Sequence, residues 1–201
     1  MATIPQGFTA IAPGLLTGRR VRLHPWTEAD HAPFAALNAD PVAMEFFPAP
    51  LTRAQSDALT VRINKAITQR GWGLWAAERL PADGRPALFM GFIGLGIPAA
   101  DLPFQPCVEI GWRLARPFWG QGLATEGARL ALRVGFEALA LDDIVSFTTL
   151  RNTRSRAVME RLGMQESPAE RFDHPSLPAG NPQRPHCLYR LPRARWSAAP
   201  Q

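Results

Sequence analysis

The sequence predicts an α/β protein, a layered α+β arrangement in one domain with a mixed central sheet. Two strand-to-helix passages carry this prediction. Residues 107–115 read as a strand that runs into a turn with two glycines, and a helical pattern starts at Thr125. Residues 143–150 read as a second strand, and a helical pattern capped by Asn152 follows it and stops at Gly163.

The remaining elements follow from local patterns along the chain. Two further helices are predicted after the N-cap residues Thr27 and Thr52, and Asp30 completes a capping box with Thr27. Residues 168–185 contain five prolines and are predicted to be a loop. The other predicted strands span residues 19–24, 72–78, 88–97 and 186–191.

Composition fits one ordinary folded domain. The chain has 201 residues, of which 46% are hydrophobic and 19% charged, so it can bury a full core. The net charge is +5, and Lys65 is the only lysine among the 22 basic residues. The arginines are scattered, so a general bias toward arginine explains them better than a nucleic-acid surface does.

The turn in Trp119-Gly-Gln-Gly-Leu-Ala-Thr-Glu126 is the most informative local feature. Gly120 and Gly122 allow backbone conformations and close approaches that a Cβ forbids. The free N–H groups and positive dipole end of the following helix would point at this turn. The combination predicts an anion site, most naturally for phosphate.

Three other interpretations compete with the anion site: a simple turn, a Rossmann dinucleotide site and a Walker loop. A bare Gly-x-Gly is most often a simple strand-to-helix turn. A Rossmann site requires Gly-x-Gly-x-x-Gly, and the third glycine here, Gly127, is offset from that spacing. A Walker loop requires Gly-Lys-Ser/Thr, and no lysine lies near the turn.

Taken together, the glycine turn and Asn152-Thr-Arg-Ser-Arg-Ala-Val-Met-Glu-Arg-Leu-Gly-Met164 resemble the two linked motifs of the GNAT (Gcn5-related) N-acetyltransferase superfamily. The likeness is greatest to the branch with the ribosomal-protein alanine acetyltransferases. It covers residues 15–195, which implies an extension at 1–14, a domain at 15–195 and a tail at 196–201.

The resemblance implies helices on both faces of the sheet and a slot where the parallel strands 107–115 and 143–150 splay apart. Unpaired backbone groups along the slot would bind the pantetheine arm of acetyl-CoA like an added strand. Asn152 would bond the cofactor from the second wall, although it also serves as a helix cap. The other residues implied to hold acetyl-CoA are Trp112, Arg113, Leu114, Gly120, Gln121, Gly122, Leu123, Ala124 and Thr125.

Glu109 is the candidate general base, acting through a water, because it would lie in the strand beside the thioester. A carboxyl group in an apolar strand tends to have a raised pKa, which suits proton abstraction near neutral pH. Backbone N–H groups near residues 110–112 would polarise the thioester carbonyl. The alternative for Glu109 is a solvent-facing residue or a structural ion pair.

Ser155 is the best-placed hydroxyl to assist the departing thiolate. Many relatives have a tyrosine seven residues after the Asn152 position, where this chain has Met159. A second helix cap is nearly as good an explanation of Ser155. A second departure is Pro117, where many relatives have Gln or Arg, and it leaves the backbone cradle intact.

Four side chains are candidates for the acceptor pocket, and each could instead be structural: Phe46, Phe47, Trp75 and His174. His186 is a further loose candidate. Cys107 would share a strand face with Glu109, so an acetyl-cysteine intermediate is conceivable, but a small buried side chain is the better explanation.

The resemblance implies acetyl-CoA-dependent N-acetylation of a primary amine, either a peptide or protein N-terminus or a small molecule. A non-catalytic acyl-CoA sensor with the same fold is the alternative. Cys107 and Cys187 have no metal-site or disulfide spacing, so we expect no metal and a cytoplasmic location. We expect no membrane or nucleic-acid partner, and a monomer or homodimer.

Overall fold

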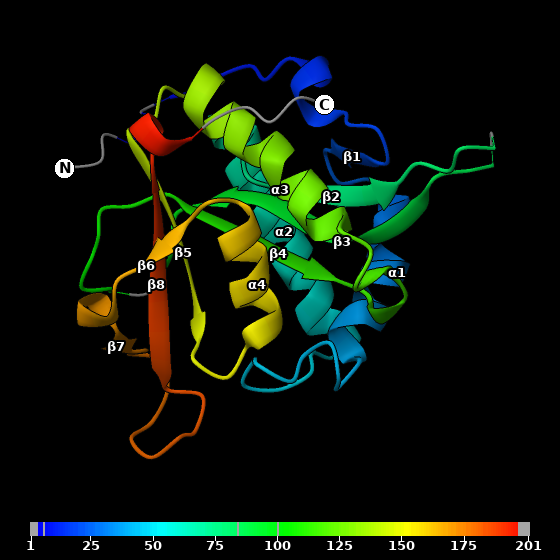
Figure 1. Ribbon diagram of the computed structural model, residues 1–201. Coiled ribbons are helices and arrows are strands. Elements are labelled where there is room, and N and C mark those ends of the chain that lie inside the picture. The colour runs from blue at the N-terminus through cyan, green and yellow to red at the C-terminus, as the bar shows by residue number, and fades with distance from the viewer. Residues whose placement is uncertain (1–3, 6, 84, 100, 197–201) are drawn as a thin grey trace.

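The computed structural model describes residues 4–5, 7–83, 85–99 and 101–196 (Figure 1). A mixed sheet of eight strands runs through the molecule in the order β1-β2-β3-β4-β5-β8-β6, with β7 beside β8. All neighbouring strands are antiparallel except β4 and β5. The strands are β1 (Val21–His24), β2 (Leu74–Arg79), β3 (Leu88–Gly96), β4 (Glu109–Leu114), β5 (Asp143–Thr149), β6 (Gln165–Glu166), β7 (Phe172–Asp173) and β8 (Pro185–Pro192).

Helices cover both faces of the sheet (Figure 1). The α-helices are α1 (Glu28–Ala39), α2 (Arg53–Arg70), α3 (Leu123–Arg133) and α4 (Thr153–Arg161). Short 3₁₀ turns lie at η1 (Pro13–Leu16), η2 (Arg116–Phe118), η4 (Pro168–Glu170) and η5 (Arg193–Arg195), and a π-helical turn, η3 (Val134–Ala138), extends α3.

The main core lies between the sheet and the face that α3 and α4 cover. Leu123, Ile110 and Met159 are buried in it. Gly127 allows α3 to approach the sheet closely, because a Cβ at this position would lie 2.4 Å from Ile93 Cδ1 of β3. On the opposite face, α1 and α2 pack over β2 and β3 through Phe34, Ile63 and other residues of a second cluster.

The parallel strands β4 and β5 pair at one position only, Glu109 with Val145. Near that position the Val145 N–H donates to Val108 O at 3.0 Å and the Ser146 hydroxyl donates to Ile110 O at 2.9 Å. Each strand is fully paired on its outer edge, β4 with β3 and β5 with β8. The two strands therefore splay apart toward their C-terminal ends, as the family resemblance implies.

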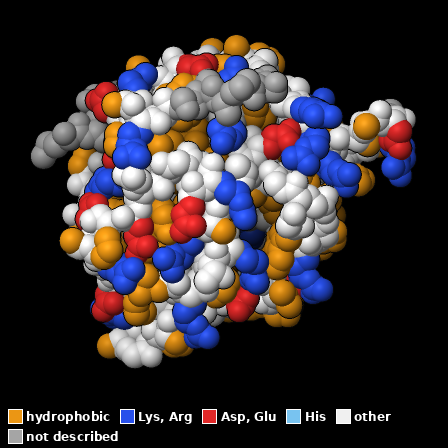
Figure 2. Space-filling view, in the orientation of Figure 1, with side chains coloured by type: hydrophobic (Ala, Val, Ile, Leu, Met, Phe, Trp, Pro, Cys, Tyr) orange, Lys and Arg blue, Asp and Glu red, His pale blue; other side chains and the backbone are white. Residues whose placement is uncertain are grey.

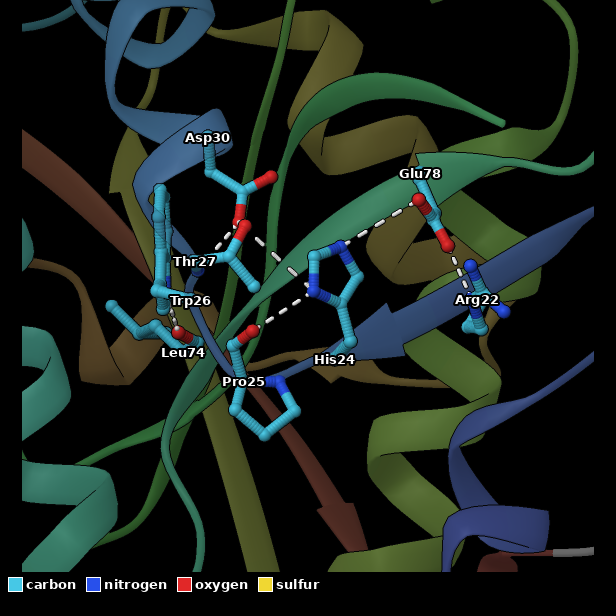
Figure 3. A network of polar contacts seen from close by, with 8 residues as sticks. All are labelled: Arg22, His24, Pro25, Trp26, Thr27, Asp30, Leu74 and Glu78. Atoms are coloured by element: carbon cyan, nitrogen blue, oxygen red, sulfur yellow. Dashed lines mark hydrogen bonds and ion pairs between the residues drawn. The ribbon is translucent and has the colours of Figure 1, made fainter. Parts of the chain in front are cut away.

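The junction between β1 and α1 is held by a polar network (Figure 3). The Asp30 carboxylate accepts hydrogen bonds from the Thr27 N–H at 2.7 Å and the Thr27 hydroxyl at 2.9 Å. The Trp26 indole N–H donates to Leu74 O of β2 at 2.7 Å. His24 lies between Asp30 and Glu78, and Glu78 also pairs with Arg22. These contacts fix the start of α1 against the sheet.

Most predicted elements are present, with ends shifted by a few residues. Thr27, Thr52 and Asn152 are N-cap residues, and Gly163 follows α4 with a positive φ of 82°. The exception is the proline-rich segment 168–185, predicted as a loop, which contains β7. Ile11 and Trp196 pack against the main core, and the domain limits at 15 and 195 stay a prediction.

Asp30→Ala should lower the free energy of unfolding by about 0.5–2 kcal/mol, because the capping box loses its acceptor. Urea denaturation followed by circular dichroism measures the change. Glu28→Ala is the matched control, since Glu28 lies in the same first turn with its side chain exposed. Equal losses in the two variants would show that the buried acceptor has no special role.

Candidate active site

The open edge of β4 forms the first wall of the slot. The Ala115 N–H donates to Met90 O of β3 at 2.8 Å, so alternation along the strand directs the backbone groups of Trp112 and Leu114 toward β5. The Trp119 indole N–H donates to Leu114 O at 2.7 Å and closes the end of this wall. The N–H and C=O of Trp112 and the N–H of Leu114 therefore remain open to the slot.

Arg113 differs from the prediction that its backbone faces the slot. Its carbonyl oxygen lies against β3, where a Cβ built on Gly91 would come within 1.9 Å of it. The physical reason is parity, because successive residues of a strand direct their backbone groups to opposite edges. The Arg113 side chain lies on the face of the sheet that α1 and α2 cover, opposite α3.

The glycine turn lies at the mouth of the slot and leads into α3. Gly120 and Gly122 have φ values of 70° and 75°, and Gly122 is the N-cap of α3. No side chain caps the helix, so its first N–H groups, from Leu123 to Thr125, remain available. Both glycines and Gln121 are exposed, and a Cβ at Gly120 would meet nothing within 4 Å. The turn is an open cradle of backbone donors.

Arg20, from the segment before β1, braces this cradle. Its Nη1 donates to Gln121 O at 3.0 Å, and its Nε donates to Glu126 Oε2 of α3 at 2.8 Å. The Arg20 backbone N–H donates to Glu126 Oε1 at 2.6 Å. Sequence reasoning missed this role, because the partners are about a hundred positions apart along the chain.

Asn152 lies at the start of α4, beside the second wall. Its Oδ1 accepts from the Ser155 N–H at 3.2 Å, and its Nδ2 donates to Thr148 Oγ1 at 3.1 Å. The side chain is thus a helix cap tied to β5, and one N–H of its amide remains for another acceptor. The Ser155 hydroxyl makes no hydrogen bond within the described residues, so the second-cap explanation does not account for it.

Glu109 lies at the closed end of the slot, in the pair that joins β4 to β5. Desolvation by burial raises the pKa of its carboxyl to about 8. No hydrogen bond or ion pair from the described part of the chain engages this carboxylate, which argues against the structural ion pair. Gly111 leaves space beside it, since a Cβ there would be 3.9 Å from Glu109 Oε1.

The predicted pocket residues fall into different places. Phe47 stacks on Arg113, with the guanidinium carbon 3.9 Å from the ring centroid, and Phe46 lies near Arg154. Both belong to the segment between α1 and α2. Trp75 is not a pocket residue, because it is only 1% exposed and packs in the main core on the α3 face. Its aromatic ring fills the core instead.

His174 and His186 lie on the other side of the slot, with Phe147 and Phe172. The two imidazole centroids are 4.9 Å apart, and each lies 6.2 Å from the Phe147 ring. Desolvation lowers the pKa of both histidines. No local sequence pattern indicated Phe147 or Phe172 as residues of this cluster. Their rings come together because β5 and β7 both pair with β8.

Cys107 is 3% exposed and packs with Val145 and Leu188. Burial, followed by the charge of Glu109, raises the pKa of its thiol to about 11. The thiolate is the nucleophilic form of cysteine, so this environment disfavours an acyl-cysteine intermediate.

The surface offers no single basic stripe on the face that Figure 2 shows, where Arg and Lys side chains alternate with acidic ones. Several arginines form ion pairs with carboxylates, among them Arg154 with Glu45 and Arg190 with Asp143. Among the described residues, no helix combines the length and apolar character needed to cross a membrane. No group of three or more potential metal ligands occurs in that part of the chain.

Residues 20–165 match the family model of the acetyltransferase (GNAT) domain, and the chain therefore belongs to the GNAT acetyltransferase family. As a member of this family it is an acyltransferase. The fold agrees with a crystal structure of a GNAT-family acetyltransferase from Bacillus anthracis, with a TM-score of 0.72 and 20% identity over 89% of this chain and 98% of that one.

Two named relatives are similar in sequence. The first is FsC-acetyl coenzyme A-N(2)-transacetylase of Aspergillus fumigatus, which is 34% identical over 64% of this chain. The matched region spans only 55% of that relative's length. The second, YdaF of Bacillus subtilis, bears the name of a ribosomal N-acetyltransferase. It is 38% identical over 29% of this chain and 32% of its own length. Its name agrees with the branch that the sequence resembles.

The raised pKa of Glu109 predicts a pH-dependent stability difference. Between the ordinary carboxyl pKa of about 4.3 and the folded value of about 8, the folded state binds more protons than the unfolded state. Burial of Glu109 therefore destabilises the protein increasingly as pH rises through this window. Glu109→Gln removes the titration, so its melting temperature should gain on the wild type between about pH 5 and about pH 9.

Thermal unfolding of both proteins over this range measures the gap. Glu28→Gln, a change at an exposed carboxylate, serves as the control for any general effect of charge. A gap between Glu109→Gln and wild type that stays constant with pH would contradict a half-buried carboxyl with a raised pKa at this position.

Proposed function

We propose that this protein transfers the acetyl group of acetyl-CoA to a primary amine by direct attack. The observation that carries the proposal is the slot between β4 and β5, which has the glycine cradle at its mouth and the desolvated Glu109 carboxyl at its closed end. The acceptor is a peptide or protein N-terminus, or a small amine.

The residues of the slot and cradle fit acetyl-CoA. Trp112 would offer its open backbone groups to the pantetheine arm, and the backbone N–H groups of Gly120 to Thr125 would bind the diphosphate. Arg20 would hold this cradle in shape. The remaining amide N–H of Asn152 would contact the bound molecule from the second wall. Leu114 and Leu123 support the two ends, Leu123 as a buried anchor of α3.

Bound acetyl-CoA would supply an acetyl group activated as a thioester. The ionised form of Glu109 accepts a proton from the acceptor ammonium, directly or through a water, and the free amine nitrogen then forms a bond to the acetyl carbon. The Trp112 N–H polarises the carbonyl as negative charge develops on its oxygen. The carbon–sulfur bond breaks, and the Ser155 hydroxyl donates or relays a proton to the departing sulfur.

Direct attack is favoured over a covalent enzyme intermediate because burial holds Cys107 as a thiol. The names of the two relatives, one a coenzyme A transacetylase and the other a ribosomal N-acetyltransferase, support acetyl-CoA and an amine acceptor. We also propose a cytoplasmic monomer or homodimer with no nucleic-acid partner. The unpaired state of both cysteines supports the cytoplasmic location.

Gly122→Val should weaken acetyl-CoA binding, because a branched side chain at the N-cap would stand where the phosphates approach the helix N–H groups. The positive φ of Gly122 also strains a valine. Gly180→Val is the matched control, since Gly180 has a φ of 81° and open space around a Cβ, but lies in the exposed loop before β8.

Isothermal titration calorimetry with acetyl-CoA separates the two variants. We expect affinity to fall at least about tenfold in folded Gly122→Val, which corresponds to about 1.4 kcal/mol, and to stay unchanged in Gly180→Val. Wild-type affinity in the folded Gly122→Val protein would remove the cradle assignment.

Glu109→Gln should lower kcat/KM by about 10²–10⁴, because the amide keeps the shape of the carboxyl but cannot accept the proton. The loss should grow as pH rises toward about 8, because below that pH the wild-type carboxyl is mostly protonated and cannot act as a base. Release of free coenzyme A thiol with an amine panel measures the rate.

Ser155→Ala should instead lower kcat with little change in acetyl-CoA affinity. Wild-type rates for Glu109→Gln at every pH would assign the base to another group, and binding without turnover in the wild type would favour an acyl-CoA sensor.

A further inference from the structure

Arg113 is a desolvated cation without an anionic partner in the described part of the chain. Its Nη1 donates to Asn38 Oδ1 at 2.5 Å, and Asn38 in turn donates to the buried Ser56 hydroxyl at 2.9 Å. Its guanidinium carbon lies 3.9 Å from the centroid of the Phe47 ring and 5.4 Å from that of Phe92. Its Nε is buried and has no hydrogen-bond partner. Desolvation lowers the pKa of Arg113 to about 10.

This arrangement leaves one edge of the guanidinium without a hydrogen-bond partner in the described part of the chain. Stacking on Phe47 engages the flat face, and Asn38 engages Nη1, so Nε and Nη2 form a free two-donor edge. That edge matches the two oxygens of a carboxylate in geometry and charge. Burial of an unpaired cation is unfavourable, and an incoming anion would relieve it. In contrast, Arg20 and Arg190 are each paired with a carboxylate.

The position of Arg113 places this edge on the acceptor side of the slot. Glu109, Gly111 and Arg113 share one face of β4 by the alternation of side chains, and Gly111 leaves the space between the other two open. Thr149 follows Val145 by four residues on β5, as Arg113 follows Glu109 on β4, so both side chains lie on the same face of the sheet beyond the point where the strands diverge. The Thr149 hydroxyl is also buried without a hydrogen-bond partner.

We propose that Arg113 binds a carboxylate carried by the acceptor, so that the preferred acceptors are primary amines with a carboxylate at the end remote from the amine. This inference rests on the proposed acetyl transfer, with the amine near Glu109. Four residues of strand span roughly 13 Å between the Cα atoms of Glu109 and Arg113. The separation favours a chain of several bonds between the amine and the carboxylate over an α-amino acid.

The test compares ω-amino carboxylates of graded chain length with their carboxamides as acceptors, by release of coenzyme A thiol. The wild type should prefer the carboxylate of a matched pair by about 10- to 100-fold in kcat/KM, the loss expected for one or two charge-assisted hydrogen bonds. The preference should be greatest at one intermediate or long chain length. Arg113→Gln should reduce the preference to less than about threefold, and Arg113→Lys should retain part of it.

The ratio of the two rates within one preparation does not depend on the fraction of folded protein, so partial unfolding of a variant cannot imitate the effect. Arg22→Gln is the control, because Arg22 pairs with Glu78 at the far edge of the sheet and should leave the preference unchanged. Equal rates of the wild type with carboxylates and carboxamides would overturn the role of Arg113 while acetyl transfer stands.

A binding measurement separates failure of this inference from failure of the proposed function. Calorimetric titration of the same ω-amino carboxylates into the protein without acetyl-CoA needs no turnover. Binding that requires the carboxylate and is lost in Arg113→Gln would support the site even if no amine were acetylated. Absence of carboxylate-dependent binding at every chain length, together with equal rates, would overturn it.

Discussion

The structure depends on the incomplete pairing of β4 with β5. The two strands meet at Glu109 and Val145 and then diverge, while each is fully paired with its outer neighbour. The Ser146 hydroxyl bridges to Ile110 O just beyond the last pair, so a side chain takes over where the backbone ladder ends. Because the outer strands hold the divergence open, backbone groups of Trp112 remain unpaired inside a rigid sheet. Such groups require a partner, and this requirement supports the proposal that the slot binds a ligand.

The sequence predicted the local elements around this slot well, because their signals are local. Asn152 caps α4, and the glycine turn ends at α3, since capping chemistry and positive φ preferences act within a few residues. The strand β7 escaped prediction because two residues within a proline-rich segment carry no periodic pattern. Its pairing with β8 arises from Phe172 meeting His186, which is a tertiary contact.

The site was predictable only in part, for a related reason. Glu109 and the cradle glycines follow from their positions in a strand and a turn. The orientation of Arg113 depends on which edge of β4 pairs with β3, and that register is not encoded in the strand itself. Aromatic residues were hardest to place, because Trp75 and Phe47 look alike in composition, yet one fills the core and the other lies 38% exposed over a guanidinium. Arg20 reaches the cradle only through the folded sheet.

The separation of Glu109 from Arg113 has a chemical consequence for the whole face. Burial alone raises the pKa of the carboxyl and lowers that of the guanidinium, and neither group contributes to the shift of the other. If they were adjacent, they would form an ion pair, which would hold the carboxyl ionised with a low pKa and occupy the guanidinium edge. Gly111 lies between them and adds no side chain to bridge the gap. The strand thus keeps a carboxyl and a guanidinium on one face without an ion pair between them, because their spacing prevents them from neutralising each other.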